Sequence, residues 1–73
     1  MKSKIYCIKS EQTNMIYIGS TTEKYLSKRF GHHKADFRRW KLGKQHYISS
    51  FELLKYDDCY IELIQIVNVI EIS

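Results

Sequence analysis

Tyr6, Tyr17, Arg29 and His33 are the residues of this sequence whose types and order could do chemistry together. A phenol titrates at about 10, so a tyrosine acts as a base only where a neighbouring cation or a metal-bound hydroxide helps to deprotonate it. A guanidinium stays charged at any working pH and presents a fork of donors that suits a phosphate. A histidine can relay a proton near neutral pH, or it can be a core residue with a satisfied ring nitrogen. The four can act together only if the fold gathers them.

The two tyrosines lie on segments that we expect to pair as a β-hairpin. Residues 4–10 alternate in polarity, residues 15–19 are rich in strand-forming types, and the polar stretch between them has hairpin length. If Tyr6 or Ile8 stands opposite Tyr17, the two tyrosines share one face of the sheet. The hairpin then places two phenols side by side.

The arginine and the histidine belong to a helix that follows the second strand. The segment Ser20–Glu23 has the form of a capping box, so we expect the helix to begin there and to run to about Trp40. Its apolar stripe comprises Leu26, Phe30, His33, Phe37 and Trp40. On a helical wheel Arg29 falls about 60° from the centre of that stripe, so it is the one basic residue aimed inward. We expect Trp40 to fill the core rather than to stack on a base.

The rest of the chain predicts a loop at residues 41–45, a short helix over residues 47–54 and a third strand over residues 59–67. The third strand is apolar on both faces, so we expect it to be well covered. Cys7 and Cys59 have no metal-ligand spacing and read as buried small hydrophobes. The element order is β-β-α-α-β, which is an α+β fold class.

Positive charge is concentrated in one part of the chain. Of the 12 Lys and Arg residues, eight lie in residues 21–46, together with only two acidic residues. A field concentrated in this way suits a phosphate backbone, although a solvated helix face is the alternative. The outer half of the helical wheel carries Lys24, Lys28, Lys34, Arg38 and Arg39, which we expect to contact phosphates of a nucleic acid.

Size and composition exclude several classes of protein. A chain of 73 residues forms one small domain, and it has no apolar stretch near the length of about 20 residues that spans a bilayer. It has two cysteines and no signal-peptide pattern, so we do not expect a disulfide framework. We expect an intracellular, soluble protein that does not bind membranes.

The ordered motifs resemble the GIY-YIG nuclease family over nearly the whole chain. The resemblance rests on Ile5-Tyr6, on Tyr17-Ile18-Gly19 eleven residues later, and on Arg29 and His33 in the following helix. Lys4 stands where the first motif usually has glycine, which bears on backbone shape more than on chemistry. The resemblance implies a single GIY-YIG-like domain over residues 1–73, with a three-stranded antiparallel sheet flanked by helices.

The resemblance also implies a metal-dependent DNA endonuclease that hydrolyses phosphodiester bonds. One of Tyr6 and Tyr17 would be the general base on the attacking water and the other would position it, without an assignment between them. Arg29 would hold the scissile phosphate. His33 would relay a proton or contact phosphate. The alternative for Arg29 is a structural ion pair with Asp36 or Glu62.

In the family a glutamate on a helix after the third strand binds the divalent ion, which we expect to be Mg²⁺. The sequence ends at Ser73, so we expect that C-terminal helix to be missing and nicking to be impaired. Glu71 is the only acidic residue near that place, and it follows the third strand too closely to be a good candidate. The metal ligand is therefore left unassigned. The alternatives are a catalytically defective nucleic-acid-binding remnant and, less favoured, a basic scaffold for a protein partner.

Overall fold

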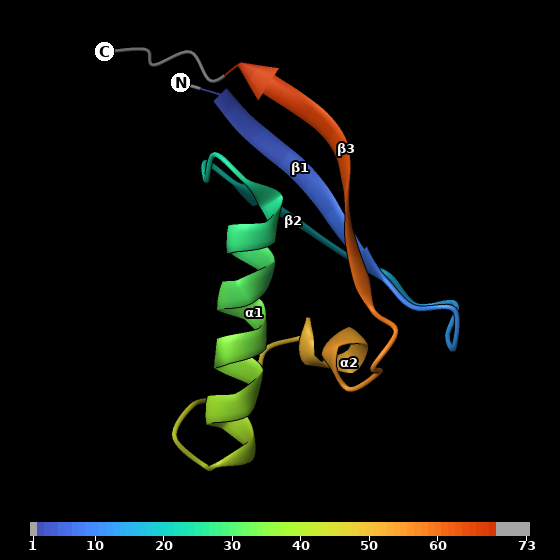
Figure 1. The fold of residues 1–73 in the computed structure, drawn as a ribbon, viewed down its shortest axis with the longest axis vertical. Helices are drawn as coiled ribbons and strands as arrows, with labels where there is room; N and C mark the ends of the chain where they lie inside the picture. Colours follow the sequence, from blue (N-terminus) through green and yellow to red (C-terminus); the bar gives the residue numbers. More distant parts are fainter. Residues whose placement is uncertain (1, 69–73) are drawn as a thin grey trace.

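The computed structural model describes residues 2–68, and its elements follow the predicted order. They are β1 (Lys2–Lys9), β2 (Tyr17–Thr21), α1 (Leu26–Lys41), α2 (Phe51–Leu54) and β3 (Tyr60–Asn68). The sheet has the strand order β2-β1-β3 with both pairings antiparallel, so β1 is the central strand (Figure 1). The α+β class and the three-stranded antiparallel sheet are confirmed. None of the helices in this part of the chain is long and apolar enough to cross a membrane.

The register of the hairpin places the two tyrosines on the same face. Ile8 stands opposite Tyr17, and Tyr6 stands opposite Gly19. The two phenol rings lie with their centroids 6.4 Å apart. A Cβ atom on Gly19 would lie 2.6 Å from the hydroxyl oxygen of Tyr6, so the ring of Tyr6 lies across the bare backbone of this glycine.

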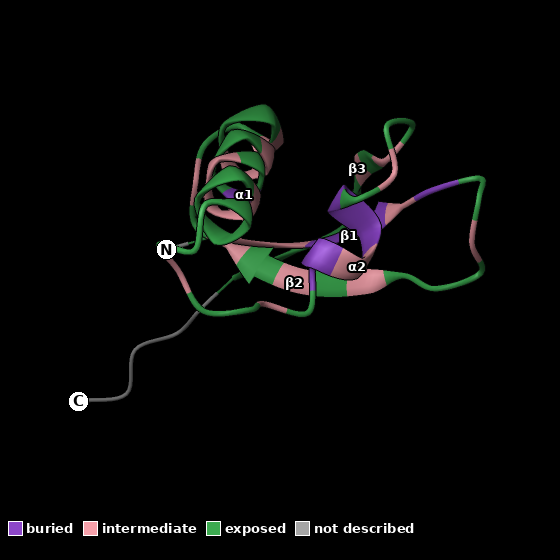
Figure 2. Cartoon of the chain, turned by 90° about the horizontal axis from the view of Figure 1, so that it is seen from below, coloured by how far each residue is buried: buried purple, intermediate pink, exposed green. Residues whose placement is uncertain are grey.

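The core is small and lies on the tyrosine face of the sheet. Tyr6 and Ile8 of β1 and Leu53 of α2 are its buried residues, and Leu26 and Phe30 of α1 pack against them. Both helices therefore cover the same face. Figure 2 shows the buried residues gathered in β1 and α2, while much of α1 and β2 is exposed.

The predicted capping box is wrong, because its first residues belong to the sheet. Ser20 and Thr21 pair with β1, and α1 begins only at Leu26, after a residue that makes no side-chain cap. The backbone hydrogen bonds between β2 and the central strand satisfy more backbone groups than a local helix cap would. The turn before α1 is held instead by the ammonium of Lys4, which donates to the carbonyl oxygens of Glu23 and Lys24 at 2.9 Å each.

Helix α1 ends within one residue of the predicted end, but α2 is shorter than predicted. The segment that reads as a helix over residues 47–54 is helical only from Phe51 to Leu54. Residues 48–50 form turns, whose carbonyl oxygens accept hydrogen bonds from the first backbone amides of α2. This places Ser50 immediately before the helix, where its side chain is fully buried.

The prediction that β3 is well covered is also wrong. Leu63, Ile64 and Ile66 are 43%, 51% and 51% exposed. The strand lies at the edge of the sheet, and the register with β1 shifts between Ile5 and Tyr6, so the two strands do not match residue for residue. Of the residues of β3, only Ile61, near the start of the strand, packs against the core.

We predict that Gly19→Ala destabilises the fold by about 1–3 kcal/mol, since the new methyl group overlaps the buried ring of Tyr6. The matched control is Gly31→Ala on α1, where an added Cβ meets nothing within 4 Å. That change should stabilise the chain by up to about 1 kcal/mol through helix propensity. Urea unfolding measures both. Equal stability of Gly19→Ala and the parent chain would contradict the close packing of Tyr6 on Gly19.

Candidate functional site

A chain of hydrogen bonds joins three of the four predicted site residues. The Nε–H of Arg29 donates to the hydroxyl oxygen of Tyr6 at 3.2 Å. That hydroxyl lies 2.7 Å from Nε2 of His33, and the other ring nitrogen of His33 lies 3.2 Å from the hydroxyl of Ser50. The network links β1, α1 and the start of α2.

Helical spacing explains why Arg29 and His33 reach the same phenol. They are four residues apart on α1, so their side chains lie one above the other on one face of the helix. The inward aim predicted for Arg29 is confirmed, since it is half-buried and bonded to Tyr6. Its alternative partners Asp36 and Glu62 make no ion pair with it in the described part of the chain.

Burial decides the protonation state of His33. The side chain is only 3% exposed, and this burial, with a further contribution from the charge of Arg29, lowers its pKa from 6.5 to about 4. His33 is therefore neutral at pH 7. Because Arg29 already donates to the oxygen of Tyr6, we assign the phenolic hydrogen to the bond with Nε2. Nδ1–H of His33 then donates to Ser50.

Tyr17 lies beside this network rather than in it. Its ring centroid is 5.4 Å from that of His33, with the rings edge to face. Unlike Tyr6, which is fully buried, Tyr17 is half-buried. Burial, and second the proximity of Tyr6, raise the pKa of Tyr17, while Arg29 opposes the shift. Tyr17 is thus a neutral phenol at the open side of the site.

Two residues that matter for this site are not apparent from the sequence as site residues. Ser50 is the partner of the inner nitrogen of His33, and no motif marks it among the serines of the chain. Gly19 is part of the second motif, but its role as a surface for the ring of Tyr6 depends on the strand register. Of the two registers that the sequence allows, only the one with Ile8 opposite Tyr17 places Gly19 opposite Tyr6.

The predicted phosphate-contacting residues lie outside the network. All five are exposed, namely Lys24, Lys28, Lys34, Arg38 and Arg39. Lys24 precedes α1 instead of lying in its first turns, because the helix begins later than predicted. Lys28 is 3.9 Å from the carboxylate of Glu23, and the ammonium of Lys34 lies over the ring of Phe30 at 4.4 Å. They extend a positive surface along α1 without joining the reactive groups.

The described residues do not offer a metal site. Within residues 2–68, no group of three or more His, Cys, Asp and Glu side chains could hold a metal ion. The hydrogen-bonded network supplies a guanidinium, one phenol and an imidazole, with the phenol of Tyr17 beside it, and these groups suit an anion and not a hard cation. Glu71 lies outside the described residues.

Comparison with known proteins gives one match. The family model for the GIY-YIG catalytic domain matches residues 2–65. No curated protein and no solved structure matches the chain. The matched region contains every element except the last residues of β3.

We predict that the chain loses stability as the pH falls from about 6.5 to about 4, because His33 binds a proton in the unfolded state before it does so in the folded state. His33→Asn should flatten the free energy of unfolding across this window. The control is His32→Asn, since this neighbour is exposed and outside the network. The measurement is urea unfolding at several pH values. An unchanged pH dependence in His33→Asn would contradict a buried neutral imidazole.

Proposed function

The chain belongs to the GIY-YIG catalytic-domain family, a family of nucleases, and we propose that it hydrolyses phosphodiester bonds in DNA. The observation that carries this proposal is the hydrogen bond from Arg29 to Tyr6, beside Tyr17. It puts a permanent cation next to a phenol on the face where both motif tyrosines stand. Phosphodiester hydrolysis needs an activated water and positive charge near the phosphorus, and these groups provide both.

In this proposal Arg29 binds the scissile phosphate. Its Nε–H is used by Tyr6, which leaves the terminal nitrogens of the guanidinium for phosphate oxygens. The side chain is half-buried, so its charge is less screened than that of the exposed lysines on the outer side of α1. The attraction strengthens as negative charge builds up on the phosphate in the transition state.

Tyr6 is the better candidate for the base, and it would act as the phenolate after its own proton has passed to hydroxide from the solvent. A negative charge on its oxygen would be stabilised by Arg29, whose Nε–H donates to it at 3.2 Å, whereas no side chain in residues 2–68 donates to the hydroxyl of Tyr17. Tyr17, at the open side, would then position the water. Because Tyr6 is fully buried, the water can reach its hydroxyl only after neighbouring side chains have moved.

His33 acts as a positioning residue in this scheme. An imidazole with a pKa of about 4 is too weak a base to keep a phenol proton in the ground state. It can nevertheless accept a hydrogen bond from Tyr6, and Ser50 fixes the orientation of its ring. This differs from the proton relay that the family resemblance implies as one role for His33.

We propose in addition that the reaction uses a divalent ion, with Mg²⁺ as the expected ion. Such an ion would stabilise negative charge on the phosphate. The residues that the structure describes do not fit it, so its ligands are not assigned to any of them.

We predict that Arg29→Ala folds normally and loses nicking of supercoiled DNA by about 100-fold to 1,000-fold, because one aimed donor contributes about that much. Tyr6→Phe should also lose activity, since it removes the base. The control is Lys28→Ala, which removes a neighbouring exposed charge and should lower nicking far less than Arg29→Ala does. Plasmid nicking in Mg²⁺ is the assay, with circular dichroism to check folding.

The outcome of this test separates two functions. Normal nicking by Arg29→Met with a loss of folding in Arg29→Ala would make Arg29 structural. If the parent chain binds DNA but does not nick it in Mg²⁺, the non-catalytic binding module replaces the nuclease proposal.

We also predict that DNA binding is weak and strongly dependent on salt. The exposed basic residues of α1 can neutralise about 3–5 phosphates, and each contributes about −0.9 to the slope of log K against log salt. Fluorescence anisotropy with a labelled duplex, in EDTA to prevent cleavage, measures this slope. Binding that is indifferent to salt would exclude a nucleic acid as the main partner.

A further inference from the structure

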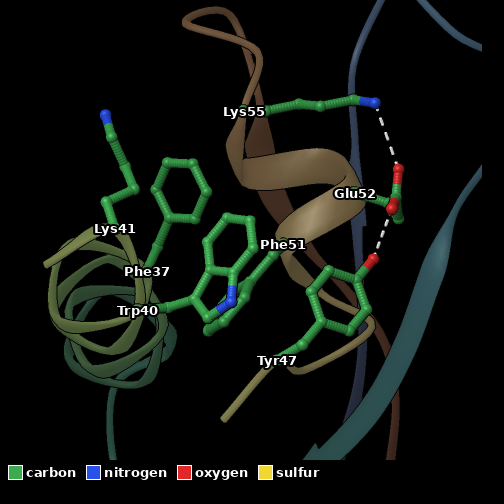
Figure 3. Close-up of a pocket in the computed structure, with 7 residues that line it drawn as sticks. All are labelled: Phe37, Trp40, Lys41, Tyr47, Phe51, Glu52 and Lys55. Carbon is green, nitrogen blue, oxygen red and sulfur yellow. Dashed lines mark hydrogen bonds and ion pairs between the residues drawn. The ribbon is translucent and has the colours of Figure 1, made fainter. Parts of the chain in front are cut away.

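A pocket lies where the C-terminal end of α1 meets α2. Its volume is about 450 Å³, within the range of about 300–1,000 Å³ typical of small-molecule sites. It is lined by Phe37, Trp40, Lys41, Tyr47, Phe51, Glu52 and Lys55 (Figure 3). The residues of the Tyr6 network are not among them, so the pocket is separate from the site described above.

Aromatic rings form most of the pocket. Phe51 is 2% exposed and forms its base, while Trp40 and Tyr47 are 37% and 50% exposed. The ring centroids of Trp40 lie 5.3 Å from Phe51 and 5.5 Å from Tyr47, so the three rings are packed against one another. Trp40 is therefore not the buried core residue that the sequence predicts. It presents part of its indole to the solvent in a fixed orientation.

The charges around the pocket favour an anion. The carboxylate of Glu52 is occupied by the hydroxyl of Tyr47 and by the ammonium of Lys55, which donates at 3.1 Å (Figure 3). The ammonium of Lys41 lies 5.2 Å from the centre of the Phe37 ring and makes no ion pair with any residue from 2 to 68. The last turn of α1 adds Arg38 and Arg39, both exposed.

We propose that this pocket binds an unpaired nucleobase of the nucleic-acid substrate, an inference that rests on the proposed function. The base stacks on the exposed indole of Trp40, and the phosphate beside it contacts Lys41. Nucleobases stack on aromatic side chains whatever their sequence, and grooves that hold single strands combine such rings with cations. A flat aromatic surface with a positive rim offers both parts of that recognition.

The distance to the reaction centre suits a nucleotide close to the cleavage point. Trp40 follows Arg29 by eleven residues on α1, which is about 16 Å along the helix axis. Nucleotides of one strand rise by about 3.4 Å each in a duplex. The pocket would therefore receive a base about five nucleotides from the phosphate that Arg29 holds. An unpaired base there would favour DNA that is nicked, frayed or single-stranded near the cleavage point.

The experiment uses Trp40 as its own probe, because it is the single tryptophan of the chain. The parent chain is titrated in EDTA with two single-stranded oligonucleotides of equal length and charge, one of thymidine and one abasic. We expect thymidine to quench the tryptophan fluorescence and to bind about fivefold to 100-fold more tightly than the abasic strand.

Variants test the two contacts separately by anisotropy of labelled oligonucleotides. Trp40→Phe should keep the preference for thymidine, and Trp40→Leu should lose it. Lys41→Met should weaken binding of both strands and reduce the salt slope by about 0.7. The control is Tyr25→Leu, which removes another exposed aromatic residue at the opposite end of α1 and should leave the preference unchanged.

The outcomes separate the pocket from the nuclease proposal. Equal affinity for both oligonucleotides, with unquenched fluorescence, overturns the proposal that the pocket binds a base, while the proposal of nucleic-acid binding stands. If neither strand nor a duplex binds at low salt, the proposed function fails and the pocket fails with it. The affinities of the parent chain for the two oligonucleotides test the base pocket even if Trp40→Leu does not fold.

Discussion

The buried hydroxyl of Tyr6 is the constraint around which this small structure is arranged. Burying a phenol completely, as Tyr6 is buried, destabilises the fold unless its hydroxyl has hydrogen-bond partners. Arg29 and His33 supply them from one face of α1, and this fixes how the helix lies on the sheet. Gly19 supplies the space that the ring needs. The same contacts therefore determine both how the helix packs on the sheet and how the site is arranged.

Such an arrangement has a consequence for stability. In a chain of 73 residues the core consists of a few side chains, and Tyr6 is among its largest fully buried ones. The residue that we propose as the base thus also stabilises the fold, because a small domain has little other apolar surface to bury. Substitutions at Tyr6 and His33 will change folding and activity together, whereas Arg29 is half-buried and allows the two to be separated.

Helix α1 presents different chemistry on its different sides. Its inner face holds Arg29 and His33 against the sheet, its outer face is basic, and its last turns bring Trp40 to the pocket with α2. The rise of about 1.5 Å per residue spaces these features along one rigid rod. A nucleic-acid strand that follows the helix could meet all of them in turn, which connects the proposed cleavage site to the proposed base pocket.

The sequence by itself determined what depends on local periodicity. The patterns in residues 4–10 and 15–19 predicted the two strands, and helical spacing predicted the inward aim of Arg29, whereas the shared face of Tyr6 and Tyr17 also required the register between the strands. Tertiary structure decided the rest, because it depends on partners distant in the chain. Pairing with β1 drew Ser20 and Thr21 out of the helix cap, and the edge position of β3 left it exposed. The contact with Ser50 and the lowered pKa of His33 arise only where three elements meet, since burial is a property of the whole fold.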